Sequence, residues 1–269
     1  MLTAFNARTA VVTGAARGIG RSLMRHALAQ GMNVVAADRD AATLEAVVEE
    51  ENAGDRLAVT VVDVTSDKQI AALADFAYDR FGAVHLLCNN AGTSCSGAVW
   101  ELDPPAWQRM LDINFFGVIR GIYHFVPRMI AAGTPGAIVN TASLAAIVSG
   151  ANLGPYTASK HALLGMSEAL LRDLRARGHP ITVSLLCPGP VKTGILTDKL
   201  SAEDRRMYRD EAARAALVQM IEGGMDPDRV ASITFDGVAA GRFWIFTHPE
   251  YLAGAKGRYE AMVGSGMID

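Results

Sequence analysis

Residues 9–20 read TAVVTGAARGIG, and this stretch decides the fold of the chain. Its first part, Thr9–Thr13, is a short apolar and β-branched run of the kind that forms a buried strand. The next segment, Arg21–Gln30, has a helical pattern and stops before Gly31. The turn between them contains glycines that allow the backbone to bend tightly and to approach a ligand closely, namely Gly14, Gly18 and Gly20. Because the N-terminus of a helix favours a phosphate group, this strand, turn and helix predict a dinucleotide-binding site.

Further apolar runs alternate with segments of helical character along the rest of the chain. The predicted strands are Thr9–Thr13, Asn33–Ala37, Leu57–Val62, His85–Asn89, Ala137–Thr141, Thr182–Leu186 and Arg242–Phe246. These runs lack a strict alternation of polar and apolar residues, which suits strands buried on both faces of a parallel sheet. A helix is predicted over Ser66–Arg80, ending near Gly82. The repeated order predicts an α/β fold of Rossmann type, a doubly wound, seven-stranded parallel sheet with helices on both faces.

The end of the second predicted strand indicates which dinucleotide binds. Asp38 lies 18 residues after Gly20, where a carboxylate can accept hydrogen bonds from the adenosine ribose hydroxyls and repel a 2′-phosphate. This favours NAD over NADP. Arg17 and Arg39 argue in the other direction, because guanidinium groups bind phosphate well, so NADP stays possible. We weigh Asp38 more heavily because its repulsion acts at the hydroxyl itself.

Composition excludes several other classes of protein. The chain has 269 residues, a net charge of −3 and a sequence pI of about 6.1, so no basic field is present to bind nucleic acid. The apolar stretches are too short to span a membrane, and the first strand begins too early for a secretory signal to precede it. Cysteines and histidines show no metal-ligand spacing, so no metal site is expected. We therefore expect a cytoplasmic protein.

The chain shows no linker or repeat, so we predict one catalytic domain over residues 1–269. The segment Gly194–Asp228 is charged, has no predicted strand and follows the sixth strand. Because ligands in such sheets bind beyond the carboxyl ends of the strands, we predict a helical substrate lid over residues 194–228. A surface helical excursion is the alternative. A tail over residues 248–269 extends past the last strand.

Several motifs in order along the chain resemble the short-chain dehydrogenase/reductase family, over about Ala10 to Phe246. They are Thr13-Gly14-x-x-x-Gly18-x-Gly20, Asp63-Val64, Asn89-Asn90-Ala91-Gly92, Asn114, Ser143, Tyr156-x-x-x-Lys160 and Pro188-Gly189-Pro190-Val191-Lys192-Thr193. The resemblance implies that Asp63 and Val64 flank the adenine, that residues 90–92 line the middle of the cofactor, and that residues 188–193 face the nicotinamide. The alternative for Asp63 is a turn or helix-capping acid.

The predicted cofactor contacts combine these implied positions with those argued from the residues themselves. They are Gly14, Arg17, Gly18, Ile19, Gly20, Asp38, Arg39, Asp63, Val64, Asn90, Ala91, Gly92, Tyr156, Lys160, Pro188, Gly189, Val191 and Thr193.

Four residues are predicted to carry the chemistry. Tyr156 and Lys160 are four apart in a helical segment, Tyr156–Ala176, so both side chains share one face. A nearby ammonium favours the phenolate, so we expect a lowered Tyr156 pKa and a role as base in oxidation and acid in reduction. The Ser143 hydroxyl, 13 residues earlier, is placed to hold the substrate oxygen. The resemblance implies that Lys160 also holds the nicotinamide ribose and that Asn114 holds a water that relays protons.

The segments expected to border the substrate are small or apolar, namely Thr93–Val99, Leu144, Ala145 and Leu153. We therefore expect hydride transfer between a nicotinamide cofactor and an apolar secondary alcohol or ketone. The resemblance implies a homodimer or homotetramer that packs its long helices, near 104–132 and 155–178, and its last strand. A faint likeness of the tail to those of relatives that act on bulky aromatic or alicyclic alcohols points the same way.

Three other functions are weaker alternatives. A catalytically silent dinucleotide sensor or scaffold of the same fold would be expected to lack a catalytic residue, and all four are present here. A nucleotide-sugar epimerase or dehydratase would carry a larger carboxy-terminal domain. Nothing in the sequence favours a non-enzymatic interaction module.

Overall fold

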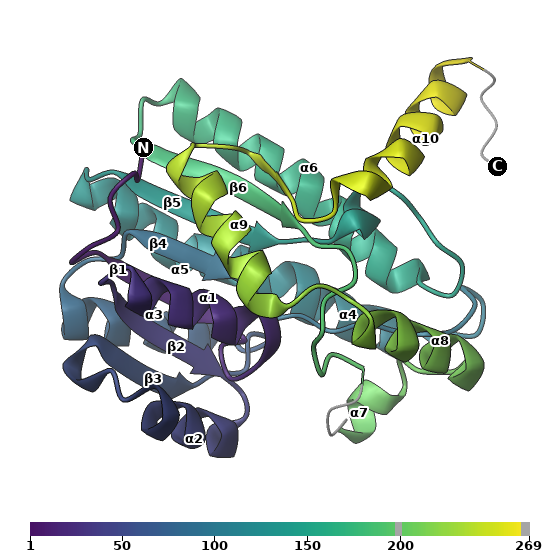
Figure 1. The fold of residues 1–269 in the computed structure, drawn as a ribbon, viewed down its shortest axis with the longest axis horizontal. Helices are drawn as coiled ribbons and strands as arrows, with labels where there is room; N and C mark the ends of the chain where they lie inside the picture. Colours follow the sequence, from purple (N-terminus) through teal and green to yellow (C-terminus); the bar gives the residue numbers. More distant parts are fainter. Residues whose placement is uncertain (197–200, 265–269) are drawn as a thin grey trace.

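The protein is described by a computed structural model that covers residues 1–196 and 201–264. A central sheet lies between two layers of helices (Figure 1). All its neighbouring strands are parallel, in the order β3-β2-β1-β4-β5-β6-β7. The strands are β1 (Thr9–Thr13), β2 (Asn33–Asp38), β3 (Leu57–Val61), β4 (Leu86–Asn89), β5 (Gly136–Thr141), β6 (Ile181–Cys187) and β7 (Trp244–Phe246).

Helices cover both faces of this sheet. They are α1 (Gly18–Ala29), α2 (Ala41–Glu51), α3 (Asp67–Phe81), α4 (Pro104–Leu111), α5 (Gly117–Ala132), α6 (Gly154–Ala176), α7 (Ala202–Arg205), α8 (Glu211–Glu222), α9 (Pro227–Ala239) and α10 (Leu252–Gly264). A π-helical turn, Asp112–Phe116, joins α4 to α5. Short 3-10 turns occupy Gly54–Arg56, Leu144–Ala146 and Pro249–Tyr251.

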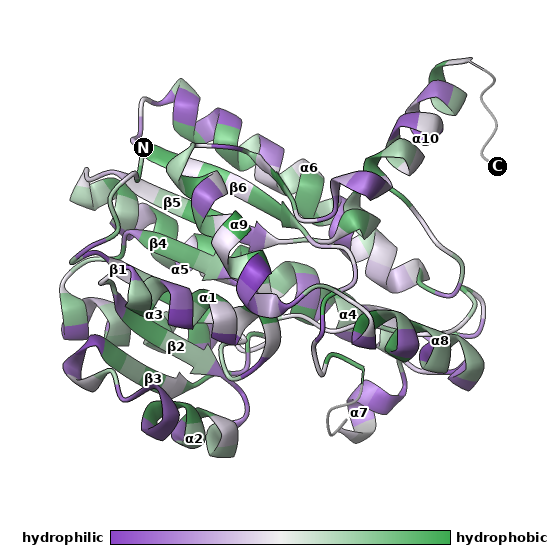
Figure 2. Ribbon diagram, viewed as in Figure 1, coloured by the Kyte–Doolittle hydropathy of each residue, from purple (hydrophilic) through white to green (hydrophobic). Residues whose placement is uncertain are grey.

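The core is divided by the sheet into two apolar layers. Successive side chains of a strand point to opposite faces. Val12 accordingly packs with α1, α2 and α9, whereas Val11 packs with α3, α5 and α6. Figure 2 shows the consequence, with apolar strands inside and polar residues on the outer faces of the helices. The three cysteines are free and buried, and burial raises the pKa of the Cys88 and Cys187 thiols to about 12.

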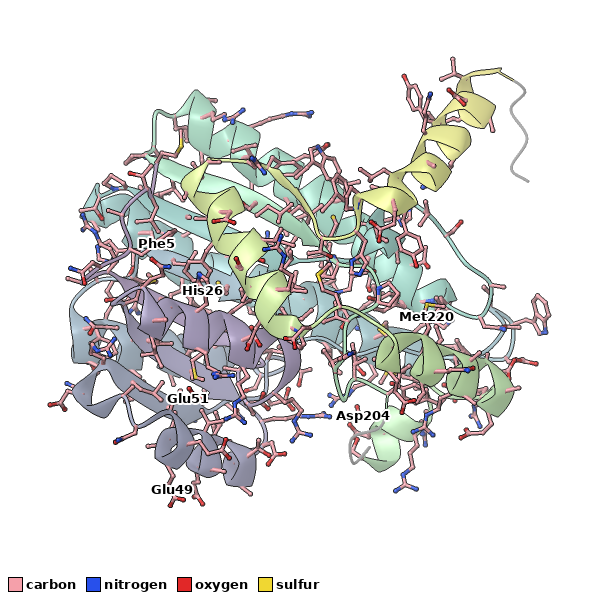
Figure 3. All side chains as sticks on the ribbon, in the orientation of Figure 1. Phe5, His26, Glu49, Glu51, Asp204 and Met220 are labelled. Carbon is pink, nitrogen blue, oxygen red and sulfur yellow. The ribbon has the colours of Figure 1, made fainter. Side chains whose placement is uncertain are left out.

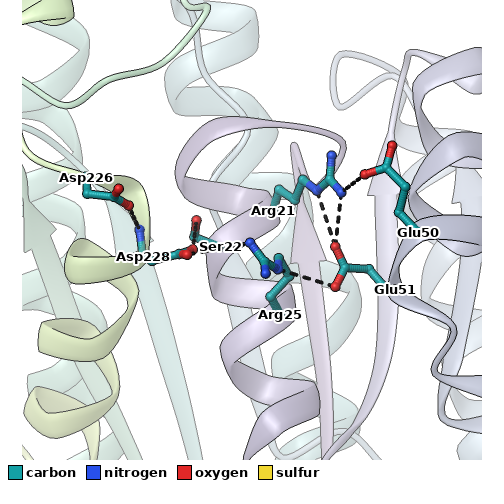
Figure 4. Close-up of polar contacts among 7 residues, drawn as sticks. All are labelled: Arg21, Ser22, Arg25, Glu50, Glu51, Asp226 and Asp228. Carbon is teal, nitrogen blue, oxygen red and sulfur yellow. Dashed lines mark hydrogen bonds and ion pairs between the residues drawn. The ribbon is translucent and has the colours of Figure 1, made fainter.

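Charged side chains join the helices of one layer to each other. Arg21 and Arg25 of α1 pair with Glu51 of α2 at 3.1 and 3.3 Å (Figure 4). On the other side of α1, Ser22 donates to Asp228 of α9 at 2.6 Å. These contacts lie at or near the surface, where an ion pair contributes little to stability.

The strand order reverses direction between β1 and β4, which are neighbours although two strands separate them in sequence. At such a point the connections from adjacent strands run to opposite faces of the sheet and leave a crevice beyond the carboxyl ends. The loops after β1, β4 and β5 all begin here, which brings together the glycine turn, residues 90–92 and Ser143.

The sequence predicted the seven strands to within two residues at each end, and the expected fold class is confirmed. Helix α1 begins at Gly18, three residues before the predicted start, so the last glycine of the turn is already helical. The predicted long helix near 104–132 is interrupted by the π-helical turn, and the one near 155–178 is α6.

The expected lid, residues 194–228, contains α7 and α8, and its residues 197–200 lie outside the described residues. Its last two residues belong instead to α9, which packs against α1. The tail forms α10, which projects from the body of the molecule (Figure 1). The predicted tail residues 265–269 also lie outside the described part of the chain.

Candidate active site

The glycine turn after β1 is held tightly against the loop after β4. Gly14 and Gly18 have φ values of +65° and +53°, in the region that favours glycine. A Cβ on Gly14 would lie 2.8 Å from the Cα of Ala91, and one on Gly20 would lie 1.9 Å from the carbonyl oxygen of Gly14. Side chains at these positions would displace the backbone, so the turn packs closely only because these residues are glycines.

Hydrogen bonds fix the same two loops to each other. The Thr13 hydroxyl accepts from the backbone N–H groups of Asn90 and Ala91 at 3.0 and 3.1 Å. The Asn90 side chain donates to the Thr13 carbonyl at 3.0 Å and accepts from Thr141 on β5 at 3.3 Å. The carboxyl ends of β1, β4 and β5 therefore form one rigid edge.

The segment after β6 closes over this edge. A Cβ on Gly18 would lie 2.9 Å from the Cγ2 methyl of Thr193, so the glycine turn and the predicted nicotinamide segment approach each other closely. Gly189 donates its N–H to Nδ1 of the buried His248 at 3.1 Å, just beyond β7. Sequence analysis gave His248 no role at the site. Its position two residues after the predicted strand Arg242–Phe246 was the one signal that it lies at this edge.

The charged residues predicted at the adenosine end are all engaged by protein groups. Asp38 accepts the N–H of Ala16 in the glycine turn at 3.0 Å. Arg17 pairs with Asp40 and donates to Thr43, and Arg39 pairs with Asp204 of α7 at 2.8 Å. Each guanidinium therefore has an acid partner within the protein.

Asp63 and Val64 lie just after β3. The Asp63 carboxylate accepts from both the N–H and the hydroxyl of Thr65, at 2.9 and 2.7 Å, and so stabilises its own turn. Val64 packs against Gly117. A Cβ added to Gly117 would lie 3.0 Å from the Cγ2 methyl group of Val64. Asp63 thus forms a turn in the structure, as the alternative interpretation of this residue expected.

Tyr156 and Lys160 lie one helical turn apart on α6, with the Lys160 Nζ 5.6 Å from the centre of the Tyr156 ring. Ser143 hydrogen-bonds the Tyr156 side chain across the site. Lys160 is almost fully buried and donates to the Thr141 carbonyl at 2.9 Å. Ser143 comes from the loop after β5 and the other two residues from α6, and the fold brings them together.

The protein's own groups shift the Tyr156 pKa in the direction opposite to the expected one. Burial raises the pKa of Tyr156, although the Ser143 hydrogen bond lowers it in part. Burial also lowers the pKa of Lys160, to about 8. The Lys160 amine donates to the Thr141 carbonyl, and the removal of the phenol from water has the largest effect on the Tyr156 pKa.

Asn114 is fully buried in the π-helical turn between α4 and α5. Its side chain accepts the Thr93 N–H at 2.8 Å, and it donates to the Thr93 carbonyl at 3.0 Å and to Ser159 at 3.2 Å. A π-helical turn widens the helix and is often found at functional sites. The poor helix propensity of asparagine was the only sequence signal for this departure.

The remaining side of the site is built by the lid. Ser96 accepts the N–H of Arg209 and donates its own N–H to the Met207 carbonyl at 2.9 Å, which fastens residues 207–209 to the loop after β4. Apolar and aromatic side chains pack beneath, namely Cys95, Leu102, Ala106, Trp107, Met110, Leu153, Tyr156, Met207 and Tyr208. Sequence analysis named residues 93–99 and Leu153 here but identified none of the lid residues that cover them.

Among the described residues, no group of three or more His, Cys, Asp or Glu side chains could hold a metal ion. Within the same residues, no helix has both the length and the apolar character needed to cross a membrane.

Comparison with known proteins gives a consistent result. The model of the short chain dehydrogenase family matches residues 8–204. The chain is 34% identical to a 1-deoxy-11-beta-hydroxypentalenate dehydrogenase of Streptomyces avermitilis, over 90% of this chain and 85% of the relative. It is 34% identical to a cyclohexanol dehydrogenase of an Acinetobacter species, over 77% of this chain and 82% of the relative.

A solved short-chain dehydrogenase/reductase from Burkholderia phymatum, in complex with NAD, superposes with a TM-score of 0.90 at 35% identity. The match covers 97% of this chain and 95% of that one. The glycine turn, the reversal of strand order and these similarities agree, and the chain belongs to the short-chain dehydrogenase/reductase family, whose members are oxidoreductases that bind a nicotinamide cofactor.

Proposed function

We propose that the protein is an NAD-dependent dehydrogenase that interconverts apolar secondary alcohols and ketones, with Tyr156 as its acid and base. The observation that carries this proposal is the cluster of Tyr156, Ser143 and the buried Lys160 at the carboxyl edge of the sheet. One phenol, one hydroxyl and one amine at this spacing can hold and move a proton on a bound oxygen.

Each of these residues has a distinct task in the proposal. A bound nicotinamide cofactor supplies the hydride acceptor or donor. Ser143 holds the substrate oxygen beside Tyr156, whose hydroxyl accepts the alcohol proton in oxidation and donates it in reduction. Because burial raises the Tyr156 pKa, the neutral phenol is the resting form, and oxidation should become faster as the pH rises.

Lys160 and Asn114 support this proton transfer without contacting the substrate. Lys160 lies within reach of the nicotinamide ribose position, since a Cβ on Gly92 would lie 3.7 Å from its Nζ. Asn114, fixed by Thr93 and Ser159, would hold the water that passes protons on from the lysine. The glycine turn, which leads directly into the N-terminus of α1, would hold the cofactor's pyrophosphate.

The substrate class follows from the surroundings of Tyr156. The side chains packed about it are apolar or aromatic, including Trp107, Leu153 and Met207. Such a surface favours a hydrocarbon ring or chain over a charged sugar, because burial of a charge without a partner is costly. The relative named for cyclohexanol fits this preference. We further propose that the chain forms a single catalytic domain in which α7 and α8 act as the lid.

The preference for NAD rests on Asp38, whose carboxylate lies at the end of β2 beside the glycine turn. A second negative charge, the 2′-phosphate of NADP, would be repelled there. Arg17 and Arg39, the cations that could offset this repulsion, are paired with Asp40 and Asp204.

The test is oxidation of cyclohexanol by the purified protein with NAD⁺, followed by the absorbance of NADH. Tyr156→Phe should lower kcat by about 10²- to 10⁴-fold, the usual contribution of a general acid–base group, and leave NADH binding nearly unchanged. Tyr123→Phe is the matched control, because Tyr123 is exposed on α5. Wild-type turnover by Tyr156→Phe on a secondary alcohol would show that Tyr156 is not the acid and base.

A further inference from the structure

Asp204 is a buried acid on the short lid helix α7, where that helix meets the body of the molecule (Figure 3). Only 1% of its side chain is exposed, whereas its neighbour Glu203 is 77% exposed. One carboxylate oxygen lies 2.8 Å from Arg39 Nη2, and the other accepts from Arg109 Nε at 3.1 Å. Asp204 is therefore held from both sides by arginines of the main body.

The two arginines come from different sides of the site. Arg109 lies on α4, beside the apolar surface under the lid. Arg39 directly follows Asp38, the acid at the end of β2 that accepts the N–H of Ala16 in the glycine turn. The contact between Arg39 and Asp204 thus joins the cofactor side of the site to the lid.

This contact removes the arginine that a phosphate would use. A guanidinium next to the adenosine ribose is well suited to bind a 2′-phosphate through two hydrogen bonds. Withdrawing Arg39 from Asp204 would leave a buried carboxylate with one partner fewer, which is unfavourable. Arg17 is held less firmly, because its acid partner Asp40 is 38% exposed and the pair is open to solvent.

We propose that Asp204 determines cofactor specificity from the lid: by holding Arg39, it withholds that guanidinium from a 2′-phosphate and so favours NAD(H) over NADP(H). This inference rests on the proposed function, since it assumes that a dinucleotide binds along β1 and β2. Asp204 acts through Arg39 and does not itself touch the cofactor.

The direct test is Asp204→Asn, which keeps the shape of the side chain and removes its charge. NADH and NADPH are titrated separately into the purified protein, with binding followed by calorimetry. The ratio of the NADPH to the NADH dissociation constant should fall about tenfold or more, the factor for one hydrogen bond to a charged group. Glu203→Gln removes the same charge from the same helix at an exposed position, and it should leave the ratio unchanged.

Arg39→Ala tests the same inference without altering the buried acid's helix. In the otherwise unchanged protein it should leave NADPH affinity the same, because Asp204 already occupies the guanidinium. In the Asp204→Asn background, Arg39→Ala should remove the increase in NADPH affinity that Asp204→Asn produces. A clear loss of NADPH affinity in the single variant would overturn the inference, and so would an equal effect of Asp204→Asn on both cofactors.

The failures of the two proposals can be told apart. If the unchanged protein binds neither NADH nor NADPH, the proposed function is wrong and this inference falls with it. If the unchanged protein binds NADH and Asp204→Asn leaves the ratio of dissociation constants as it was, the inference alone is wrong.

Discussion

The two sides of the site are built in different ways. On the cofactor side, backbone N–H groups of the glycine turn and of residues 90–91 are held by the side chains of Asp38 and Thr13, in loops that directly follow β1, β2 and β4. On the lid side, a buried ion pair joins two side chains, those of Arg109 and Asp204, which are separated by 95 residues. The first side is packed around glycines that leave no room for an added Cβ, and the second depends on a contact between two charged side chains.

This difference determines which substitutions each side of the site tolerates. A backbone loop fails when an added atom displaces it, whereas a side-chain contact fails when one partner is removed. The expected effects can therefore be measured separately, by adding one methyl group on the cofactor side and by deleting one partner on the lid side.

The largest effect on stability is expected on the lid side, from Arg109→Ala. This change leaves the buried Asp204 with Arg39 as its remaining arginine partner at the site. We expect the free energy of unfolding to fall by about 3 kcal/mol, because a buried charge that loses a partner is strongly destabilising. Urea denaturation measures the change.

Arg172→Ala is the control for this experiment. Arg172 is 80% exposed and pairs with Glu168 one helical turn away on α6. Its loss should change the free energy of unfolding by about 0.5 kcal/mol or less. Equal effects of the two changes would mean that the lid-side pair behaves as a surface pair, and the contrast between the two sides would disappear.

The same contrast explains which parts of the molecule could be predicted from the sequence. Strands and the glycine turn have short-range patterns, and these predictions were confirmed. The partner of Arg39 could not be predicted, because Asp204 carries no local mark that separates it from the exposed Glu203 beside it. The rise in the Tyr156 pKa was missed for a related reason, since it depends on burial by the whole fold.

Asn114 lies between these cases. The family resemblance named this residue, but the π-helical turn lies where Asn114 contacts Thr93 and Ser159 across the site. The sequence could therefore mark the position without predicting its geometry.

On the cofactor side, Gly20→Ala should lower the free energy of unfolding by up to about 3 kcal/mol, because an added Cβ would lie 1.9 Å from the Gly14 carbonyl oxygen. NADH affinity should fall as well, since the turn must move. Gly165→Ala, an exposed helical glycine with no atom near the added Cβ, should stabilise the protein by about 0.5 to 1 kcal/mol. Unaltered NADH binding and stability in Gly20→Ala would show that the turn is not tightly packed.

Lys160 lies between the two sides and allows a smaller, pH-dependent test. In the folded protein, burial lowers its pKa from 10.5 to about 8. Between these pH values the unfolded chain binds more protons than the folded chain, so this group makes the free energy of unfolding rise with pH. From pH 8 to pH 10 the rise should be about 2 kcal/mol.

Lys160→Met removes this contribution while it keeps an unbranched side chain of similar length. Its stability relative to the wild type should therefore decline by about 2 kcal/mol from pH 8 to pH 10, as the wild type gains what the variant lacks. Lys68→Met, on the exposed surface of α3, should show a constant difference from the wild type over the same range. If the difference in the free energy of unfolding between Lys160→Met and the wild type also stayed constant, the Lys160 amine would be hydrated. The carboxyl edge of the sheet would then be open to water at this point.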